Sequence, residues 1–144
     1  MPPARQQTAL TSSLALTLNL LFMAKKIRVG ITHGDINGIS YEIILKALGN
    51  EEITELLTPV IFGSEKALQY YWKRFGMEDF RCRSISTAAE AADGPVNLMD
   101  VCGPDIHIDT GTATREAGHA AFAAPQAAVN ALPEGPIHVL VPAP

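Results

Sequence analysis

"RVGITHGDINGISYE", residues 28–42, leads from an apolar stretch through a turn with two glycines into the start of a helix. A strand that ends in glycine before a helix leaves free backbone N–H groups at the carboxyl edge of a sheet, next to the positive end of the helix dipole. Open α/β folds bind anionic and polar ligands at this edge. We therefore expect a substrate or cofactor cleft here, lined by His33, Gly34, Asp35, Asn37 and Gly38.

A second interpretation of the same turn needs no ligand. Asp35 and Asn37 are residue types that accept hydrogen bonds from turn backbones and cap helices. The stretch also matches neither the GxGxxG dinucleotide fingerprint nor the GxxxxGK[ST] phosphate loop. On spacing alone the two interpretations stay open.

The rest of the chain alternates short apolar runs with helical periods. This pattern predicts strands at 27–32, 58–63, 80–85, 96–100 and 137–141, and helices at 38–49, 64–76 and 113–132. A small alanine-rich turn or helix is expected near 87–92, and a loop at 103–112 with a possible short strand inside it. Strands that alternate with helices favour an α/β fold, with a mostly parallel sheet and helices on its faces.

Composition narrows the classes of function. The 144 residues are 47% hydrophobic and 18% charged, which suits one globular domain. Eleven Lys and Arg against fifteen Asp and Glu, without a basic cluster, argue against nucleic-acid binding. Cys82 and Cys102 form no CxxC pair, so neither a disulfide framework nor a zinc ribbon is indicated, and a cytoplasmic location is the expectation.

The amino-terminal residues raise a separate question. "LALTLNLLFMA", residues 14–24, resembles the apolar core of a secretory signal, but it is too short to span a bilayer and Asn19 interrupts it. We favour a natural start at Met23, with residues 1–22 an upstream extension that is disordered or helical, and residues 23–144 the folded part. No membrane association is expected.

Two prolines conflict with the local pattern. Pro125 falls inside the predicted helix 113–132, where a proline lacks a donor and clashes with the carbonyl four residues earlier. Either two helices meet at this residue or the fold tolerates it badly. Pro142 follows the last predicted strand and cannot donate to a sheet ladder if that strand is central.

The four histidines show no metal-ligand spacing such as HxxxH. His33, His107, His119 and His138 are therefore expected to face solvent or to make hydrogen bonds, with a cleft position as the alternative for His33. Asp105 and Asp109 flank His107 and form at best a weak site for a hard cation. We assign no catalytic and no metal residues in this chain.

Two separated motifs resemble one enzyme family. "ITHGDINGISYE" resembles the T-x-G-D-P-x-G-I-G-P-E motif of 4-hydroxythreonine-4-phosphate dehydrogenases, with Ile36, Ser40 and Tyr41 in place of Pro, Gly and Pro. The stretch at 116–144 is similar to the family's E-A-G-x-x-A helix and its strand ending in V-T-x-P, with Pro142 in place of Thr. The resemblance covers roughly residues 28–144.

The resemblance implies an αβα sandwich of the isocitrate and isopropylmalate dehydrogenase type, incomplete here. Its members are homodimers that use NAD or NADP and a divalent metal such as Zn, Mg or Co. They oxidise 4-phosphooxy-L-threonine to a 3-oxo acid, which then loses carbon dioxide, in pyridoxal 5'-phosphate (vitamin B6) biosynthesis.

The family's metal histidines and most of its substrate residues follow the V-T-x-P strand, so none maps onto this chain. The resemblance therefore implies the amino-terminal part of such an enzyme, which holds no cofactor by itself and is inactive alone. The alternative is a non-catalytic α/β module that binds a small anion or a partner protein.

Overall fold

The computed structural model describes residues 13–18 and 25–144. Residues 13–18 form a short helix with exposed side chains, and the rest of the predicted extension, 1–12 and 19–22, lies outside the described residues. Among the residues described, no helix combines the length and the apolar character needed to cross a bilayer.

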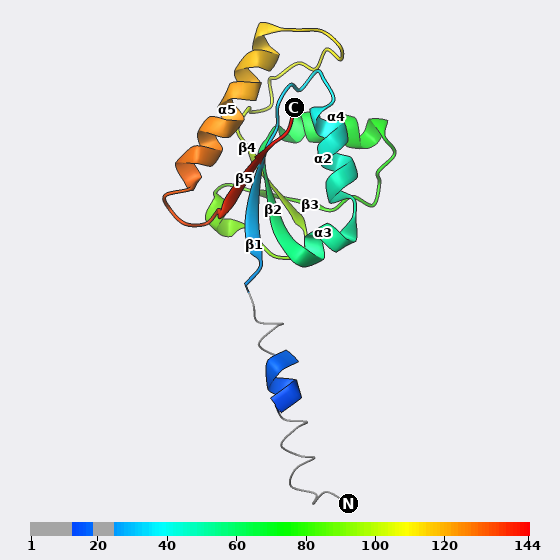
Figure 1. Ribbon diagram of the computed structural model, residues 1–144. Helices are drawn as coiled ribbons and strands as arrows, with labels where there is room; N and C mark the ends of the chain where they lie inside the picture. Colours follow the sequence, from blue (N-terminus) through cyan, green and yellow to red (C-terminus); the bar gives the residue numbers. More distant parts are fainter. Residues whose placement is uncertain (1–12, 19–24) are drawn as a thin grey trace, which may run out of the picture.

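Five strands form one parallel sheet in the order β3-β4-β2-β1-β5 (Figure 1). The strands are β1 (Ile27–Thr32), β2 (Leu57–Gly63), β3 (Cys82–Ile85), β4 (Val96–Asp100) and β5 (Val139–Pro142). The prediction of a mostly parallel sheet is confirmed, and β3 and β5 are its edges. β1 lies between β2 and β5, so the turn after β1 is flanked by the ends of both.

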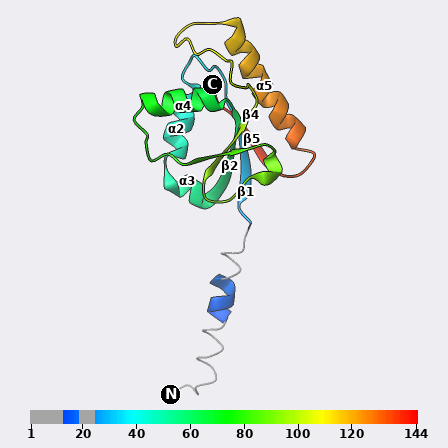
Figure 2. The ribbon, with the colours of Figure 1, turned by 180° about the vertical axis from the view of Figure 1, so that it is seen from behind.

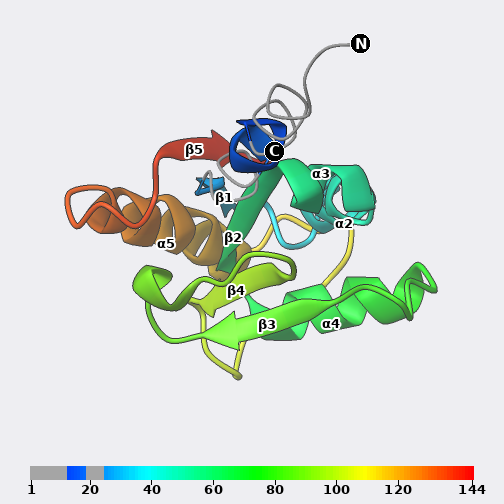
Figure 3. The same ribbon diagram turned by 90° about the horizontal axis from the view of Figure 1, so that it is seen from below.

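The helices connect the strands and cover both faces of the sheet. They are α2 (Ser40–Leu48), α3 (Glu51–Leu56), α4 (Glu65–Arg74), the 3-10 turn η1 (Ala88–Glu90) and α5 (Arg115–Ala131). α5 lies on one side of the sheet, and α2 and α4 lie on the other, as the view from below shows (Figure 3). The view from behind shows the same separation (Figure 2).

Alternation along β2 divides the core into two clusters. Val60 and Phe62 pack with Ala124 and Ala128 of α5, whereas Ile61 between them packs against the α2 and α4 side. Successive side chains of a strand point to opposite faces, so one apolar strand supplies both clusters. This explains why 58–63 is an almost continuous apolar run.

Two predicted features differ from the structure. The loop 103–112 contains no strand. α5 is one continuous helix with Pro125 inside it, so two helices do not meet there. Buried alanines at 117, 120, 124 and 128 form the face of this helix that packs into the core.

Candidate functional site

The turn 33–38 lies at the carboxyl edge of the sheet, between the end of β1 and the start of α2 (Figure 1). The backbone N–H of His33 donates to the Phe62 carbonyl at 3.1 Å, and that of Ala143 donates to the Thr32 carbonyl at 2.9 Å. The turn is thus held between the ends of β2 and β5. Its exposed and half-exposed positions are Gly34, Asp35 and Gly38.

His33 points into the core rather than towards solvent. The residue is 1% exposed, and its Nε2 lies 2.8 Å from the Ala120 carbonyl of α5 while its Nδ1 lies 2.7 Å from the Tyr41 hydroxyl. Since a carbonyl only accepts, Nε2 carries the proton and Nδ1 accepts from Tyr41. Of the two predictions for this residue, the hydrogen-bonded role describes the observed geometry.

Burial also sets the charge of this network. Desolvation lowers the pKa of His33, although the Ala120 carbonyl and the Asp100 charge act in the opposite direction. Burial raises the pKa of Tyr41, so its hydroxyl stays protonated. That hydroxyl also accepts from the Ser64 backbone N–H at 2.7 Å, which joins the ends of β1 and β2 to the first turn of α2.

Gly34 lies where the chain after β5 crosses the turn. A Cβ at this position would overlap the backbone carbonyl of Pro144, so only glycine fits without a shift of the main chain. Its N–H donates to the Ser40 hydroxyl at 2.9 Å, and the Asp35 N–H is 3.3 Å from the Pro144 oxygen. Gly34 therefore allows three segments to meet at one corner of the sheet.

Asp35 is the exposed charged group of the turn. Its Oδ1 accepts from the Asn37 N–H at 2.9 Å, and its main-chain carbonyl accepts from the Gly38 N–H at 3.1 Å. A Cβ at Gly38 would lie 3.1 Å from Asp35 Oδ2, which is a tight contact. Asp35 thus closes the turn with one carboxylate oxygen while the residue remains open to solvent.

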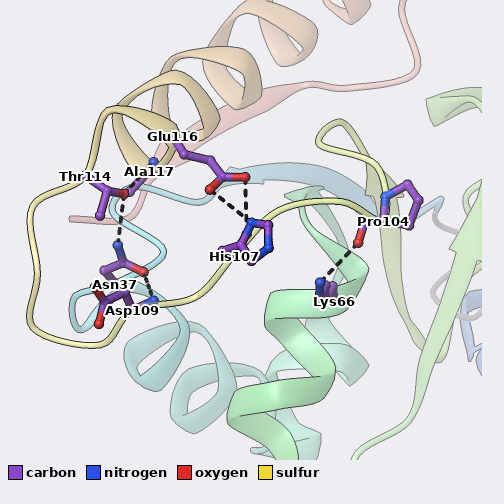
Figure 4. A network of polar contacts seen from close by, with 8 residues as sticks. All are labelled: Asn37, Lys66, Pro104, His107, Asp109, Thr114, Glu116 and Ala117. Carbon is purple, nitrogen blue, oxygen red and sulfur yellow. Dashed lines mark hydrogen bonds and ion pairs between the residues drawn. The ribbon is translucent and has the colours of Figure 1, made fainter.

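Asn37 fastens a distant loop to the turn (Figure 4). Its buried amide donates to the Thr112 carbonyl at 3.0 Å and to the Thr114 hydroxyl at 3.3 Å, and accepts from the Asp109 N–H at 2.8 Å. The Gly111 N–H also donates to the Asn37 carbonyl at 2.8 Å. The Asn37 side chain thus neither caps α2 nor bonds its own turn, as the interpretation without a ligand expected, but bonds a loop more than seventy residues away.

Two further contacts hold the loop over the carboxyl edge. Glu116 of α5 accepts from the His107 N–H at 3.2 Å and lies 3.4 Å from its imidazole Nδ1 (Figure 4). Lys66 of α4 donates to the Pro104 carbonyl at 3.2 Å. The loop is thus attached to α4, α5 and the turn.

The remaining histidines lie apart from one another. His107 and His119 are exposed, and His138 Nδ1 accepts from the Arg28 N–H at 2.9 Å. In the described part of the chain no three His, Cys, Asp or Glu side chains group as metal ligands would, Asp105 and Asp109 included. Cys82 and Cys102 are free thiols, and burial, with a smaller contribution from Asp100, raises the pKa of Cys102 to about 11.

The first turn of α2 has no side-chain cap. Its N-cap residue is Ile39, whereas Asn50, Ser64 and Thr114 cap α3, α4 and α5 with side-chain oxygens. The first turn of α2 contains one acidic residue, Glu42, and the exposed Asp35 lies in the turn before it. Because Ser40 and Tyr41 are completely buried, this corner offers a polar ligand the Asp35 carboxylate and the half-exposed backbone of Gly34 and Gly38.

Sequence reasoning missed Ser40 and Tyr41 as parts of this corner. Both are completely buried, and both bond to the turn through their hydroxyls. The available signal was that these two positions depart together from the resembled motif. Two polar residues that replace Gly and Pro beside a buried histidine indicate a local hydrogen-bond network.

Comparison with known proteins identifies relatives along most of the chain. A 4-hydroxythreonine-4-phosphate dehydrogenase of Bacteroides thetaiotaomicron is 37% identical over 119 residues, 83% of this chain and 32% of the relative. A putative D-threonate 4-phosphate dehydrogenase of Symbiobacterium thermophilum is 34% identical over 76% of this chain and 36% of the relative. The chain thus spans about one third of the length of these relatives.

Solved structures agree with these similarities. A 4-hydroxythreonine-4-phosphate dehydrogenase from Burkholderia phymatum superposes with a TM-score of 0.73 at 26% identity, over 82% of this chain and 36% of that chain. The enzyme of the same name from Klebsiella pneumoniae gives 0.71 at 26% identity, over 83% of this chain and 37% of that chain. A search against protein-family models found no match.

Proposed function

Because the chain belongs to the 4-hydroxythreonine-4-phosphate dehydrogenase family, we propose that it forms the amino-terminal part of an NAD(P)-dependent dehydrogenase unit. The reaction of that unit is oxidation of a secondary alcohol on a phosphorylated four-carbon acid, followed by decarboxylation of the 3-oxo acid. Turn 33–38 forms one wall of the cleft in this proposal. The unit acts as a cytoplasmic homodimer, and the free thiols fit a reducing compartment.

The single observation that carries the cleft assignment is the place of the turn. It follows the internal strand β1 at the carboxyl ends of the strands, where open parallel sheets bind ligands, and it leads into the uncapped start of α2. Within the turn, we assign to Asp35 a direct contact with the ligand. Gly34 and Gly38 allow the ligand to approach the backbone closely. His33 and Asn37 keep this wall in place through their buried bonds.

The residues described here do not fit a divalent metal, because no three ligating side chains converge. We therefore derive no step through a metal. The nicotinamide cofactor supplies hydride acceptance when it is bound, and this chain contributes a surface that orients polar groups. We propose that the chain alone does not turn over substrate.

The relatives are named for two phosphorylated substrates, which leaves two candidates of one chemical class. The 4-hydroxythreonine-4-phosphate group includes the Bacteroides relative, at 37% identity, and the D-threonate group includes the Symbiobacterium relative, at 34%. We favour 4-phosphooxy-L-threonine because the higher identity extends over more of this chain.

A chimera tests the proposal directly. Residues 25–144 replace the matched third of the Bacteroides relative, and NAD(P)H formation is measured with both substrates. We expect turnover, and we expect Asp35→Ala to lower kcat/KM at least tenfold while Glu134→Ala on an exposed turn has no effect. A folded chimera that is active and insensitive to Asp35→Ala would refute the cleft assignment.

The unmodified chain provides the complementary test. Purified chain with 4-phosphooxy-L-threonine, NAD and a divalent metal should give no NADH, and clear turnover would refute its proposed inactivity. The alternative function is a non-catalytic module that binds a small anion or a partner protein. It predicts a cooperatively folded monomer whose thermal transition rises with phosphate.

A further inference from the structure

A pocket of about 1040 Å³ lies at the amino-terminal ends of the strands, at the opposite end of the sheet from turn 33–38. It is bordered by the amino-terminal ends of β3 and β4, the ends of α2 and α4, and α3. Its apolar floor includes Trp72 and Phe80, whose rings meet edge to face at 5.7 Å, together with Met77. We call this feature the base pocket.

The rim of the base pocket is predominantly acidic. Glu51 and Glu55 of α3 stand on one side, and Glu78 and Asp79 follow α4 on the other. The basic groups at the rim are Lys26 and Arg81. An apolar occupant flanked by basic residues on one side would therefore match both the floor and the rim.

The chain itself carries a segment with this chemistry. Residues 14–24, LALTLNLLFMA, are almost entirely apolar, and Lys25 and Lys26 follow them. Residues 1–26 contain Arg5, Lys25 and Lys26 and neither Asp nor Glu. In the described helix 13–18, Leu14 and Leu16 are 65% and 66% exposed, so these side chains have apolar surface left to bury.

The connection between segment and pocket is short. Lys26 lines the base pocket, and its Nζ donates to the Thr54 carbonyl of α3 at 2.7 Å. Residues before Lys26 are thus tethered at the mouth of the pocket. A tether of a few residues gives an effective concentration of the order of millimolar, which lets even a weak contact form.

Because the apolar lining, the acidic rim and the short connection all suit this segment, we propose that residues 14–24 bind in the base pocket of their own chain. The apolar side chains cover Trp72 and Phe80, and Lys25, which follows the segment, lies beside the acidic rim. The contact is independent of the proposed dehydrogenase function, because it uses the other edge of the sheet. It makes the amino-terminal segment an intramolecular ligand of the folded part.

Fluorescence of Trp72 tests the proposal, because the chain contains one tryptophan and it lies in the pocket. We compare acrylamide quenching of the full chain with that of the Leu18→Asp, Leu21→Asp, Phe22→Asp variant. The variant should show at least a twofold higher quenching constant and a red-shifted emission. A peptide of residues 12–24 added to this variant should restore protection in a saturable way.

Two controls keep the outcome interpretable. Glu55→Lys with Glu78→Lys alters the rim only, at exposed residues, and should also raise quenching; far-UV circular dichroism confirms folding of each variant. Equal quenching in all three proteins, without an effect of the peptide, would overturn the proposal. Protection that disappears on dilution would assign the segment to a second copy and would overturn the intramolecular contact.

Discussion

At the scale of single residues, the corner after β1 is defined by buried polar bonds. Among the described residues, no buried side-chain nitrogen or oxygen lacks a partner. Ser40 and Tyr41 differ from the resembled motif, yet each bonds to the residue whose position it fixes: Gly34 and His33. Such networks cost little free energy of folding when every member has a partner, whereas removal of one member destabilises the fold strongly.

Protonation of His33 makes the stability of this hydrogen-bond network depend on pH. Its folded pKa lies below its unfolded value because burial disfavours the charged imidazole. The unfolded chain therefore binds the proton first, so the stability that neutral His33 provides is complete above the unfolded pKa near 6.5 and is lost as the pH falls below it. We expect this residue to contribute a slope of at most about 1.4 kcal/mol per pH unit.

The measurement is the free energy of unfolding in urea between pH 7.5 and 5. The His33→Gln variant retains an amide donor for the Ala120 carbonyl but does not titrate, so its curve should be flatter than that of the natural chain. The carboxylates titrate in both proteins and cancel in the difference. Parallel curves would show that His33 is not the titrating group.

Asn37→Ala should destabilise the fold by about 2 kcal/mol, because it leaves the Asp109 N–H and the Thr112 carbonyl without their partner. Asn37→Asp retains the acceptor for the Asp109 N–H but places a buried carboxylate oxygen against the Thr112 carbonyl, so it should destabilise the fold at least as much. Hydrogen exchange at the Asp109 amide should accelerate in the alanine variant. A change below about 0.5 kcal/mol would mean that water replaces the amide at no cost.

Glycine positions provide a matched pair. Gly34→Ala places a methyl group against the Pro144 backbone and should destabilise by about 1–3 kcal/mol, since main chain must move. Gly118→Ala in α5 meets nothing within 4 Å and should stabilise by about 0.5–1 kcal/mol. Thermal midpoints of the two variants should shift in opposite directions, and a common direction would contradict the geometry.

At the scale of elements, Pro125 is the residue that disagrees with its surroundings. It lacks the donor that would bond the Ala121 carbonyl, yet α5 continues through it. Pro125→Ala should therefore raise stability by about 1–3 kcal/mol, measured as the urea midpoint. Pro133→Ala, just after α5, serves as the control and should change it by less than about 0.5 kcal/mol. Loss of stability in Pro125→Ala would mean that the helix is shaped around the ring.

Pro142 is accommodated by topology. Because Ala143 donates to Thr32, the neighbouring position 142 directs its nitrogen away from β1, towards the free side of edge strand β5. A missing donor on a free edge breaks no bond. Pro142 would interrupt the hydrogen bonding of the sheet only if another strand paired with the free side of β5.

Periodicity was sufficient for β2, β4 and the long helices, because each buries apolar side chains. It also located β1, β3 and β5, which bury fewer side chains. It failed for α3, whose six residues have no buried side chain and therefore no apolar pattern. The position of turn 33–38 followed from the strand-to-helix order. The orientation of its side chains did not, because their partners at Thr112 and Ala120 are far away in sequence.

At the scale of the whole molecule, two elements, α5 and β5, expose apolar side chains. Phe122 and Val129 on α5 are 70% and 54% exposed, and Val139 and Val141 on β5 are nearly half exposed. β5 also offers unpaired backbone groups along its free edge. Exposed apolar surface of this kind drives association of chains in water.

We therefore expect the purified chain to associate with rising concentration, and we expect Phe122→Lys with Val129→Lys to shift it towards monomer. Both residues point outward from α5, so the core should be unaffected. Sedimentation velocity from about 5 to 200 μM measures the change. Ile39→Lys, an equally exposed substitution beside α2, should leave association unchanged, because a general effect of added charge would appear in it as well. Equal association of all three proteins would remove α5 from the interface and leave the backbone edge of β5 as the contact.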